Sequence, residues 1–324
     1  MYKRQLFFGN TPDEKWKLCR QMGINYAIAK LASNLTDAPS IDNYESFKRS
    51  KEIFEENGFQ LYGLEGDQFD MHRIKLGLKG READIEKYLK MLENMGRLGV
   101  SLLCYNFMAT GWYRTHHSIS ERGGAKVSGF DYEIAIKGPI SKWGEFSENQ
   151  IWDNYQWFLE RVMPVAEANG VKMALHPDDP PISPVHGIAR ILTSAKAMDK
   201  ALSLYDSSSH GLTFCQGTFT TMNEDVLSML HKHGKNNKIF FVHIRDVVGK
   251  PGNFRETFHD NGPTDMFSFM RAYKEVGFKG TLRSDHVPTM EGESNENVGY
   301  EMKGNLFGIG YIKGLMHACG IETS

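Results

Sequence analysis

Four short stretches of the chain each place one metal-binding type of side chain directly after an apolar run. They read MALHPDDPP, GLTFCQGTF, FFVHIRDV and LRSDHVPTM, and the side chains are His176, Cys215, His243 and Asp285. Two imidazoles, one thiolate and one carboxylate carry two negative charges, which match a divalent cation. The soft thiolate suits zinc or iron, whereas the hard carboxylate and open positions for oxygen ligands suit manganese. The four stretches together predict a metalloenzyme.

Each of these residues also has an ordinary structural interpretation. A single histidine after a strand is more often a hydrogen-bonded structural residue than a ligand, and Cys215 could be a small buried apolar side chain. Asp285 could simply cap a turn. The shared placement after four apolar runs favours the ligand interpretation for all of them.

Two further residues near the last of these stretches are candidates for proton transfer. His286 directly follows Asp285, and an imidazole titrates near neutral pH, so it suits general acid or base catalysis. The alternative for His286 is a hydrogen bond that supports the site. Tyr300 lies in the glycine-rich segment ENVGYEMKGN, and its position alone favours ordinary packing.

The elements that must position these residues follow a repeat. Helical periodicity is followed by a glycine, then by a short strand-like run, at Gly23, Gly58, Gly99, Gly170 and Gly277. The strand candidates are 5–8, 26–30, 60–65, 101–106, 172–176, 211–215, 239–244 and 280–285. Eight strands separated by helices predict a closed (β/α)8 TIM barrel, α/β in class, with one domain over residues 1–324. An open doubly wound sheet is the alternative, but no GxGxxG motif follows the first strand.

One connection departs from the repeat. Residues 108–146 follow the fourth predicted strand and include GWYRTHHSISERGGAKVSGFD, which has several glycines and little periodicity. Long connections of this kind are usually functional or disordered, and this one leaves the face where barrel enzymes hold their sites. We expect an irregular, lid-like insertion that covers the substrate.

Composition excludes several classes of protein. The formal charge of −2 provides no basic field for nucleic acid or an anionic membrane. No apolar run approaches the roughly 20 residues of a membrane-spanning helix, and the first residues do not form a secretory signal. The four cysteines are far apart, which predicts free thiols and a cytoplasmic location.

At this point the chain resembles a known family. The blocks ALHPDDPP, GLTFCQG, VHIRDV, FHDNGPTDM, DHVPTM and GIGYIKGL are similar to those of D-mannonate dehydratases, within the xylose isomerase-like barrel superfamily. The likeness covers roughly residues 60 to 315. It implies manganese on the four metal-ligand candidates, with Fe²⁺, Co²⁺ or Zn²⁺ as alternatives, and proton transfer by His286 and Tyr300. It also implies conversion of D-mannonate into 2-keto-3-deoxy-D-gluconate plus water.

The first sixty residues match this family less well. LFFGNTP replaces the Trp-Tyr-Gly-Pro opening, and AKLASNLTDAPS replaces a loop that usually carries a histidine. Much later in the chain, Ser284 stands where proline is usual. The predicted metal and proton-transfer positions are intact, whereas the loops that shape the sugar pocket differ. The reaction type is therefore a firmer prediction than the substrate.

Four further residues are candidates for contacts with a sugar acid. Arg114 and Arg245 could grip its carboxylate bidentately, or could form surface ion pairs. Asn106 and His259 could contact its hydroxyls, although the residues around His259 also read as a turn before a helix. A homodimer is possible, and no nucleic acid or membrane partner is expected.

Other functions remain open from the sequence. A metal-dependent dehydratase, isomerase or epimerase of a different sugar or sugar acid could use the same barrel. Isomerase and epimerase sites of this kind usually have Glu, Asp and His, which Cys215 does not match. A DNA-repair endonuclease would need a basic groove and more zinc ligands. A non-catalytic metal-binding barrel would leave the HDNGP and DHVPTM blocks without a role.

Overall fold

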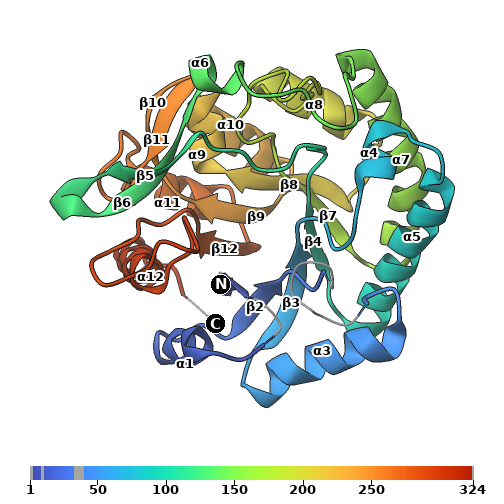
Figure 1. The fold of residues 1–324 in the computed structure, drawn as a ribbon. Coiled ribbons are helices and arrows are strands. Elements are labelled where there is room, and N and C mark those ends of the chain that lie inside the picture. The colour runs from blue at the N-terminus through green and yellow to red at the C-terminus, as the bar shows by residue number, and fades with distance from the viewer. Residues whose placement is uncertain (1–2, 9–10, 33–39, 323–324) are drawn as a thin grey trace.

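The computed structural model describes residues 3–8, 11–32 and 40–322, and eight parallel strands form its centre (Figure 1). They are β1 (Lys3–Phe8), β2 (Tyr26–Ala29), β3 (Gln60–Glu65), β4 (Leu102–Tyr105), β7 (Lys172–Leu175), β8 (His210–Cys215), β9 (Ile239–Ile244) and β12 (Thr281–Ser284). Their order is β1-β12-β9-β8-β7-β4-β3-β2, and β1 pairs with both β12 and β2, so the sheet curls into a barrel. All eight strands overlap the predicted ranges, and the predicted α/β class is confirmed.

Helices connect the strands and surround the barrel. They are α1 (Glu14–Gln21), α3 (Tyr44–Glu56), α4 (His72–Leu76), α5 (Arg81–Leu98), α7 (Glu148–Ala168), α8 (Ala195–Ser203), α9 (Gln216–Thr221), α10 (Val226–Lys235), α11 (Met266–Glu275) and α12 (Met302–Ala318). A capping box is present at the start of α7, where Ser147 and Gln150 satisfy each other's backbone N–H groups. Among the described residues, no helix is long and apolar enough to cross a bilayer.

The predicted repeat corresponds to the ends of the helices. All five glycines that precede the predicted strands have φ between 65° and 80°, a left-handed conformation that ends a helix at low cost. The helix faces between them are buried as the periodicity indicates. In α5 and α7, for example, Tyr88 meets Phe158 edge to face with ring centroids 5.1 Å apart. This packing holds the helices against the barrel.

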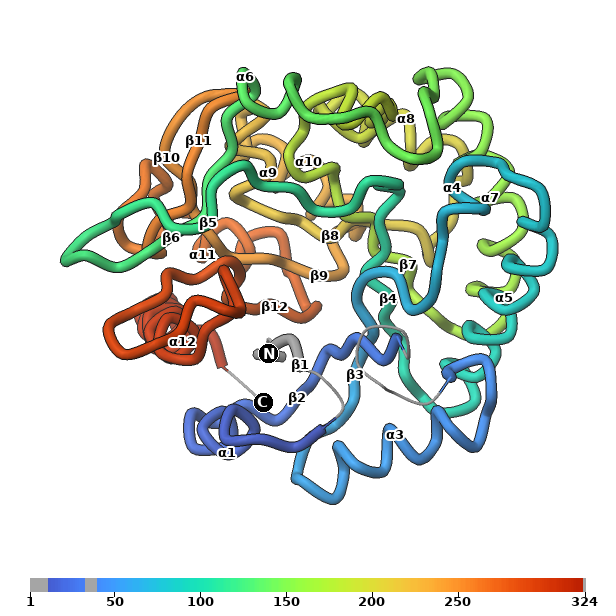
Figure 2. Tube along the Cα trace, viewed as in Figure 1, coloured from blue at the N-terminus to red at the C-terminus, as the bar shows by residue number. Residues whose placement is uncertain are grey.

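A second sheet lies outside the barrel, and the sequence did not predict it. Its antiparallel strands have the order β10 (Val247–Lys250), β11 (Asn253–Glu256), β6 (Lys126–Asp131) and β5 (His116–Ser120). In Figure 2 the green β5–β6 hairpin lies beside the orange β10–β11 hairpin. The sheet buries Phe130, Val247 and Phe254 in a small apolar cluster.

The expectation of an irregular 108–146 connection was therefore wrong in part. This segment contains β5, β6, the 3₁₀ turn Arg122–Gly124 and the short helix α6 (Tyr132–Ala135). Its central strand β6 pairs with β11, more than a hundred residues later in the chain. Local periodicity cannot reveal such a partner, because the strands are short and their stabilising contacts are distant in sequence.

Candidate active site

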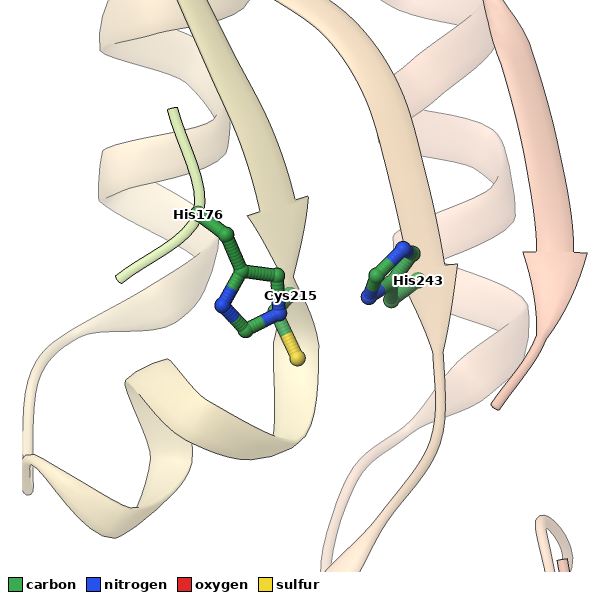
Figure 3. Close-up of side chains that lie close together, drawn as sticks. All are labelled: His176, Cys215 and His243. Carbon is green, nitrogen blue, oxygen red and sulfur yellow. The ribbon is translucent and has the colours of Figure 1, made fainter. Parts of the chain in front are cut away.

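The four predicted metal ligands meet at the carboxyl end of the barrel. Cys215 is the last residue of β8, His243 is the penultimate residue of β9, and His176 and Asp285 directly follow β7 and β12. Donor atoms of His176, Cys215 and His243 all lie within 4.8 Å of one another (Figure 3). Asp285 Oδ2 lies 3.6 Å from His243 Nδ1. These four strands are neighbours in the barrel, which explains why their ends converge.

The surroundings of His243 fit a metal site. Its side chain is buried, and neither ring nitrogen has a hydrogen-bond partner among the described residues. Burial and the nearby Arg283 guanidinium hold the pKa of His243 well below its ordinary value, so the ring is neutral and can offer a lone pair. A buried imidazole without hydrogen bonds is costly unless something else satisfies it, and a metal ion would do so.

Cys215 lies where its thiol ionises easily. Burial alone would raise its pKa, but the Arg245 guanidinium and the His176 imidazole lower it to about 7. Arg245 Nε lies 3.3 Å from Cys215 Sγ and 3.5 Å from Asp285 Oδ2, so one guanidinium supports two candidate ligands. The thiolate is the form of cysteine that binds metals.

A cavity of about 370 Å³ opens beside these residues. The candidate ligands on its wall are His176, His243 and Asp285, and both proton-transfer candidates, His286 and Tyr300, line it as well. Its volume falls within the range of small-molecule sites. The cavity therefore brings the proposed metal and acid–base groups to a single substrate-sized space.

Two buried arginines form an ion-pair network behind this wall. Arg114 contacts Asp179 at 2.6 Å and Glu256 at 2.7 Å, and Arg245 contacts the same two carboxylates at 2.7 and 2.5 Å. Both guanidinium groups are fully buried, so the surface ion-pair alternative was wrong. Burial opposes ionisation of Glu256, but Arg245 and His286 lower its pKa to about 2. The network is a fixed support next to the cavity.

His286 and Tyr300 lie at the cavity side of this support. His286 Nδ1 is 3.1 Å from Glu256 Oε1, and its Nε2 is 3.9 Å from Asp285 Oδ2. The backbone φ of His286 is +43°, an uncommon value outside glycine that often marks functional sites. The Tyr300 ring meets the imidazole edge to face at 5.5 Å, and its hydroxyl lies 3.4 Å from Asp285 Oδ1.

Comparison with known proteins shows the family to which the chain belongs. A family model described as D-mannonate dehydratase matches residues 1–139 and 135–323. The chain belongs to the D-mannonate dehydratase family. It is 31% identical over 303 residues to a mannonate dehydratase of Streptococcus uberis, which covers 85% of this chain and 86% of the relative. A mannonate dehydratase of Halalkalibacterium halodurans is also 31% identical, over 295 residues, with 81% and 85% covered.

Solved structures agree with this membership. The crystal structure of mannonate dehydratase from Streptococcus suis covers 100% of this chain and 97% of its own, with a TM-score of 0.88 and 29% identity. A D-psicose 3-epimerase from Clostridium cellulolyticum has a TM-score of 0.62 at 13% identity, which shows a shared fold only. The family match begins at residue 1, so it extends further than the expected 60 to 315. Residues 33–39 of the divergent second-strand loop lie outside the described residues.

Of the two other candidates for substrate contact, Asn106 lies at the cavity and His259 does not. Asn106 lines the cavity, and its side-chain oxygen accepts hydrogen bonds from Lys75 Nζ at 2.8 Å and from the Met108 backbone. His259 is buried behind β12, where its Nε2 lies 2.9 Å from the Ile244 carbonyl oxygen. His259 is not on the wall of this cavity.

Sequence reasoning missed several charged residues of the site. Lys30 and Glu65 lie at or just after the ends of β2 and β3, so the signal that revealed the metal candidates was present for them too. Arg283 lies within β12 and pairs with both Glu65 at 2.7 Å and Asp285 at 2.8 Å. Glu256 gave no signal, because it belongs to the unpredicted hairpin.

Proposed function

We propose that this protein is a metal-dependent dehydratase that converts D-mannonate into 2-keto-3-deoxy-D-gluconate and water. The observation that supports this most is one cavity lined by His176, His243 and Asp285 together with His286 and Tyr300, with Cys215 clustered beside the two imidazoles, in a member of the D-mannonate dehydratase family. A sugar acid is the expected small-molecule partner, since its relatives are named as mannonate dehydratases.

His176, Cys215, His243 and Asp285 would hold the divalent cation, with Mn²⁺ as the first candidate. When bound, the cation supplies Lewis-acid stabilisation of the negative charge that develops next to the substrate carboxylate. The donor set has two anionic and two neutral members, which suits a doubly charged ion. Arg245 contacts Cys215 and lies near Asp285, so it favours the ionised form of both donors.

The protein's own groups then move two protons. We assign the base to His286, which takes the C2 proton, so that the C2–H electrons form a C2–C3 double bond. Burial and the nearby Asp285 raise the pKa of Tyr300 well above its ordinary value, so its hydroxyl stays protonated. Tyr300 therefore protonates the C3 hydroxyl, which leaves as water as the C3–O bond breaks. The resulting enol becomes the keto acid, and each positioned group contributes about 10²–10⁴-fold.

We further propose that the chain is one (β/α)8 domain in which residues 108–146 act as a cover for the substrate. Met108, Gly111 and Trp112 lie on the cavity wall, and the buried ion pairs of Arg114 anchor the segment just after them. Limited proteolysis with and without D-mannonate tests this. Protection of the segment by ligand is expected, and equal cleavage under saturating ligand would count against a cover.

The decisive test of the reaction is an assay on the manganese-loaded protein with a panel of hexonates. Formation of a 2-keto-3-deoxy acid from D-mannonate supports the proposal in full. Turnover of a different hexonate would keep the dehydratase chemistry and replace the substrate. No product from any hexonate would overturn the proposed function.

A further inference from the structure

We propose that Lys30 binds the carboxylate of the sugar acid and thereby determines specificity for acids over neutral sugars. Lys30 directly follows β2, and its half-buried side chain lines the cavity together with Glu65, Gly66 and Asp67. This inference rests on the proposed function, because it names the residue that recognises the charged group of that substrate.

The other cations on the cavity wall already have carboxylate partners. Arg283 contacts Glu65 at 2.7 Å and Asp285 at 2.8 Å, so its charge is matched by two anions. Below the wall, the ammonium group of Lys75 lies 2.7 Å from Asp67 and 2.8 Å from Asn106. If Arg283 turned to an incoming anion, the buried Asp285 would lose this partner, and if the buried Lys75 did so, Asp67, Asn106 and the Met108 carbonyl would lose theirs.

The two arginines that were predicted to bind the substrate carboxylate also have carboxylate partners within the protein. Arg114 and Arg245 share Asp179 and Glu256, in a buried arrangement of two cations and two anions of which Asp179 lines the cavity. Moving either guanidinium toward substrate would break charge-assisted hydrogen bonds in a desolvated environment, which is strongly unfavourable. These two residues therefore do not supply the cation that a sugar acid needs.

Lys30 differs from all of these. Within the described part of the chain, no carboxylate lies in ion-pair range of its ammonium group, and no hydrogen bond from it is present. Burial lowers its pKa, which reflects a cation that lacks full solvation. Such a group gains more from an incoming anion than a solvated or paired lysine does.

The ammonium group of Lys30 lies next to Gly66 at the cavity. Gly66 has a φ of +76°, and a Cβ added there would lie 3.8 Å from Lys30 Nζ, in contact with it. In the barrel order, β2 stands opposite β8, which carries Cys215. A sugar acid at the barrel mouth therefore has the candidate metal ligand Cys215 on one side and Lys30 on the other.

The experiment compares the manganese-loaded protein with Lys30→Met and Lys30→Arg by calorimetric titration with D-mannonate, all in a His286→Asn background that keeps the metal and suppresses turnover. Lys30→Met keeps the length and apolar stem, and loss of a charged hydrogen bond predicts about 10- to 100-fold weaker binding. Lys30→Arg should stay within about fivefold of the protein that keeps Lys30. The neutral isostere D-mannonamide serves as the control, and its affinity should change less than about threefold in Lys30→Met.

Two results would overturn the assignment. One is unchanged D-mannonate affinity in Lys30→Met, and the other is equal weakening for D-mannonate and D-mannonamide, which would indicate a change of pocket shape. Metal content and circular dichroism of each variant are measured alongside. Because binding is measured without turnover, Lys30-dependent binding in a protein that does not dehydrate D-mannonate would reject the proposed function and keep this assignment.

Discussion

His286 Nδ1 lies 3.1 Å from Glu256 Oε1, and this contact fixes the face that the imidazole turns to the cavity. Glu256 is itself held by Arg114 and Arg245, so the ring has a rigid anionic neighbour on one side. The opposite nitrogen, Nε2, lies on the side of Asp285. A carboxylate that fixes the tautomer and orientation of a histidine is a recurring arrangement in acid–base catalysis.

Glu256→Gln should lower kcat by about 10- to 100-fold, because the neutral amide neither stabilises a protonated ring nor balances the two arginines. KM should change much less than kcat, and metal content should stay the same. Steady-state kinetics and elemental analysis measure these effects.

Glu121→Gln is a matched control for this change. Glu121 is also a buried carboxylate next to the second sheet, and it pairs with Arg255 at 2.7 Å without contacting His286. Similar losses of kcat in both variants would show that general damage to the second sheet, and not the His286 contact, explains the effect.

His286→Asn and Tyr300→Phe should each lower turnover by about 10²–10⁴-fold while the metal stays bound. Both groups line the cavity without being part of the cluster His176, Cys215 and His243. Turnover and bound metal are measured on the same samples. Full activity of Tyr300→Phe on a confirmed substrate would remove this tyrosine from the mechanism and leave the dehydratase function in place.

Cys215→Ser should lose most of the bound metal, because a serine hydroxyl does not ionise near neutral pH as this thiol does. Cys104→Ser is the control. Cys104 belongs to a second possible cluster with Glu65 and His243, but burial holds its pKa well above the ordinary value, and Arg283 already pairs with Glu65. Elemental analysis measures the bound metal in both variants and so distinguishes the two clusters. Metal loss only in Cys104→Ser would move the ion to this second cluster.

The stability of the fold should fall in acid, partly because of His210. This buried histidine contacts the Tyr105 hydroxyl through Nε2 at 2.9 Å and the Tyr205 carbonyl through Nδ1 at 3.1 Å. Burial lowers its pKa from 6.5 to about 4. Between these values the unfolded chain binds the extra proton, so the contribution is complete above pH 6.5 and is lost as the pH falls toward 4.

The difference between the two pKa values of His210, in the unfolded and the folded chain, corresponds to about 3 kcal/mol of unfolding free energy. Urea unfolding of the wild type and of His210→Gln between pH 4 and pH 7 measures it, since glutamine can keep one hydrogen bond and does not titrate. The variant should show a flatter dependence on pH. Parallel curves for the two proteins would contradict the assignment.

The barrel and its proposed metal site could be predicted because their signals are local. Each barrel strand is a short apolar run, most of them after a helix that ends at glycine, and Cys215 and Asp285 stand at the ends of such runs. Once the strands are placed in a barrel, the position of these side chains follows from the geometry of parallel strands.

The second sheet and its role could not be predicted in this way. The pairing of β6 with β11 joins distant parts of the chain, and Glu256 reaches His286 only through that pairing. The partners of Arg114 were hidden for the same reason, because a sequence does not show whether an arginine is buried against a carboxylate. Lys30, by contrast, stands at the end of a predicted strand, so its position at the barrel mouth could have been predicted in the same way as that of the metal-ligand candidates.

Residues with different proposed roles come from different parts of the chain. The cluster and the acid–base pair come from residues 176–300, whereas Lys30 and the wall around Gly66 come from the first seventy residues. With the roles proposed above, substitutions in the first seventy residues would change the selection of acids over neutral sugars and leave the residues proposed for metal binding and proton transfer unchanged. The two properties could then evolve separately.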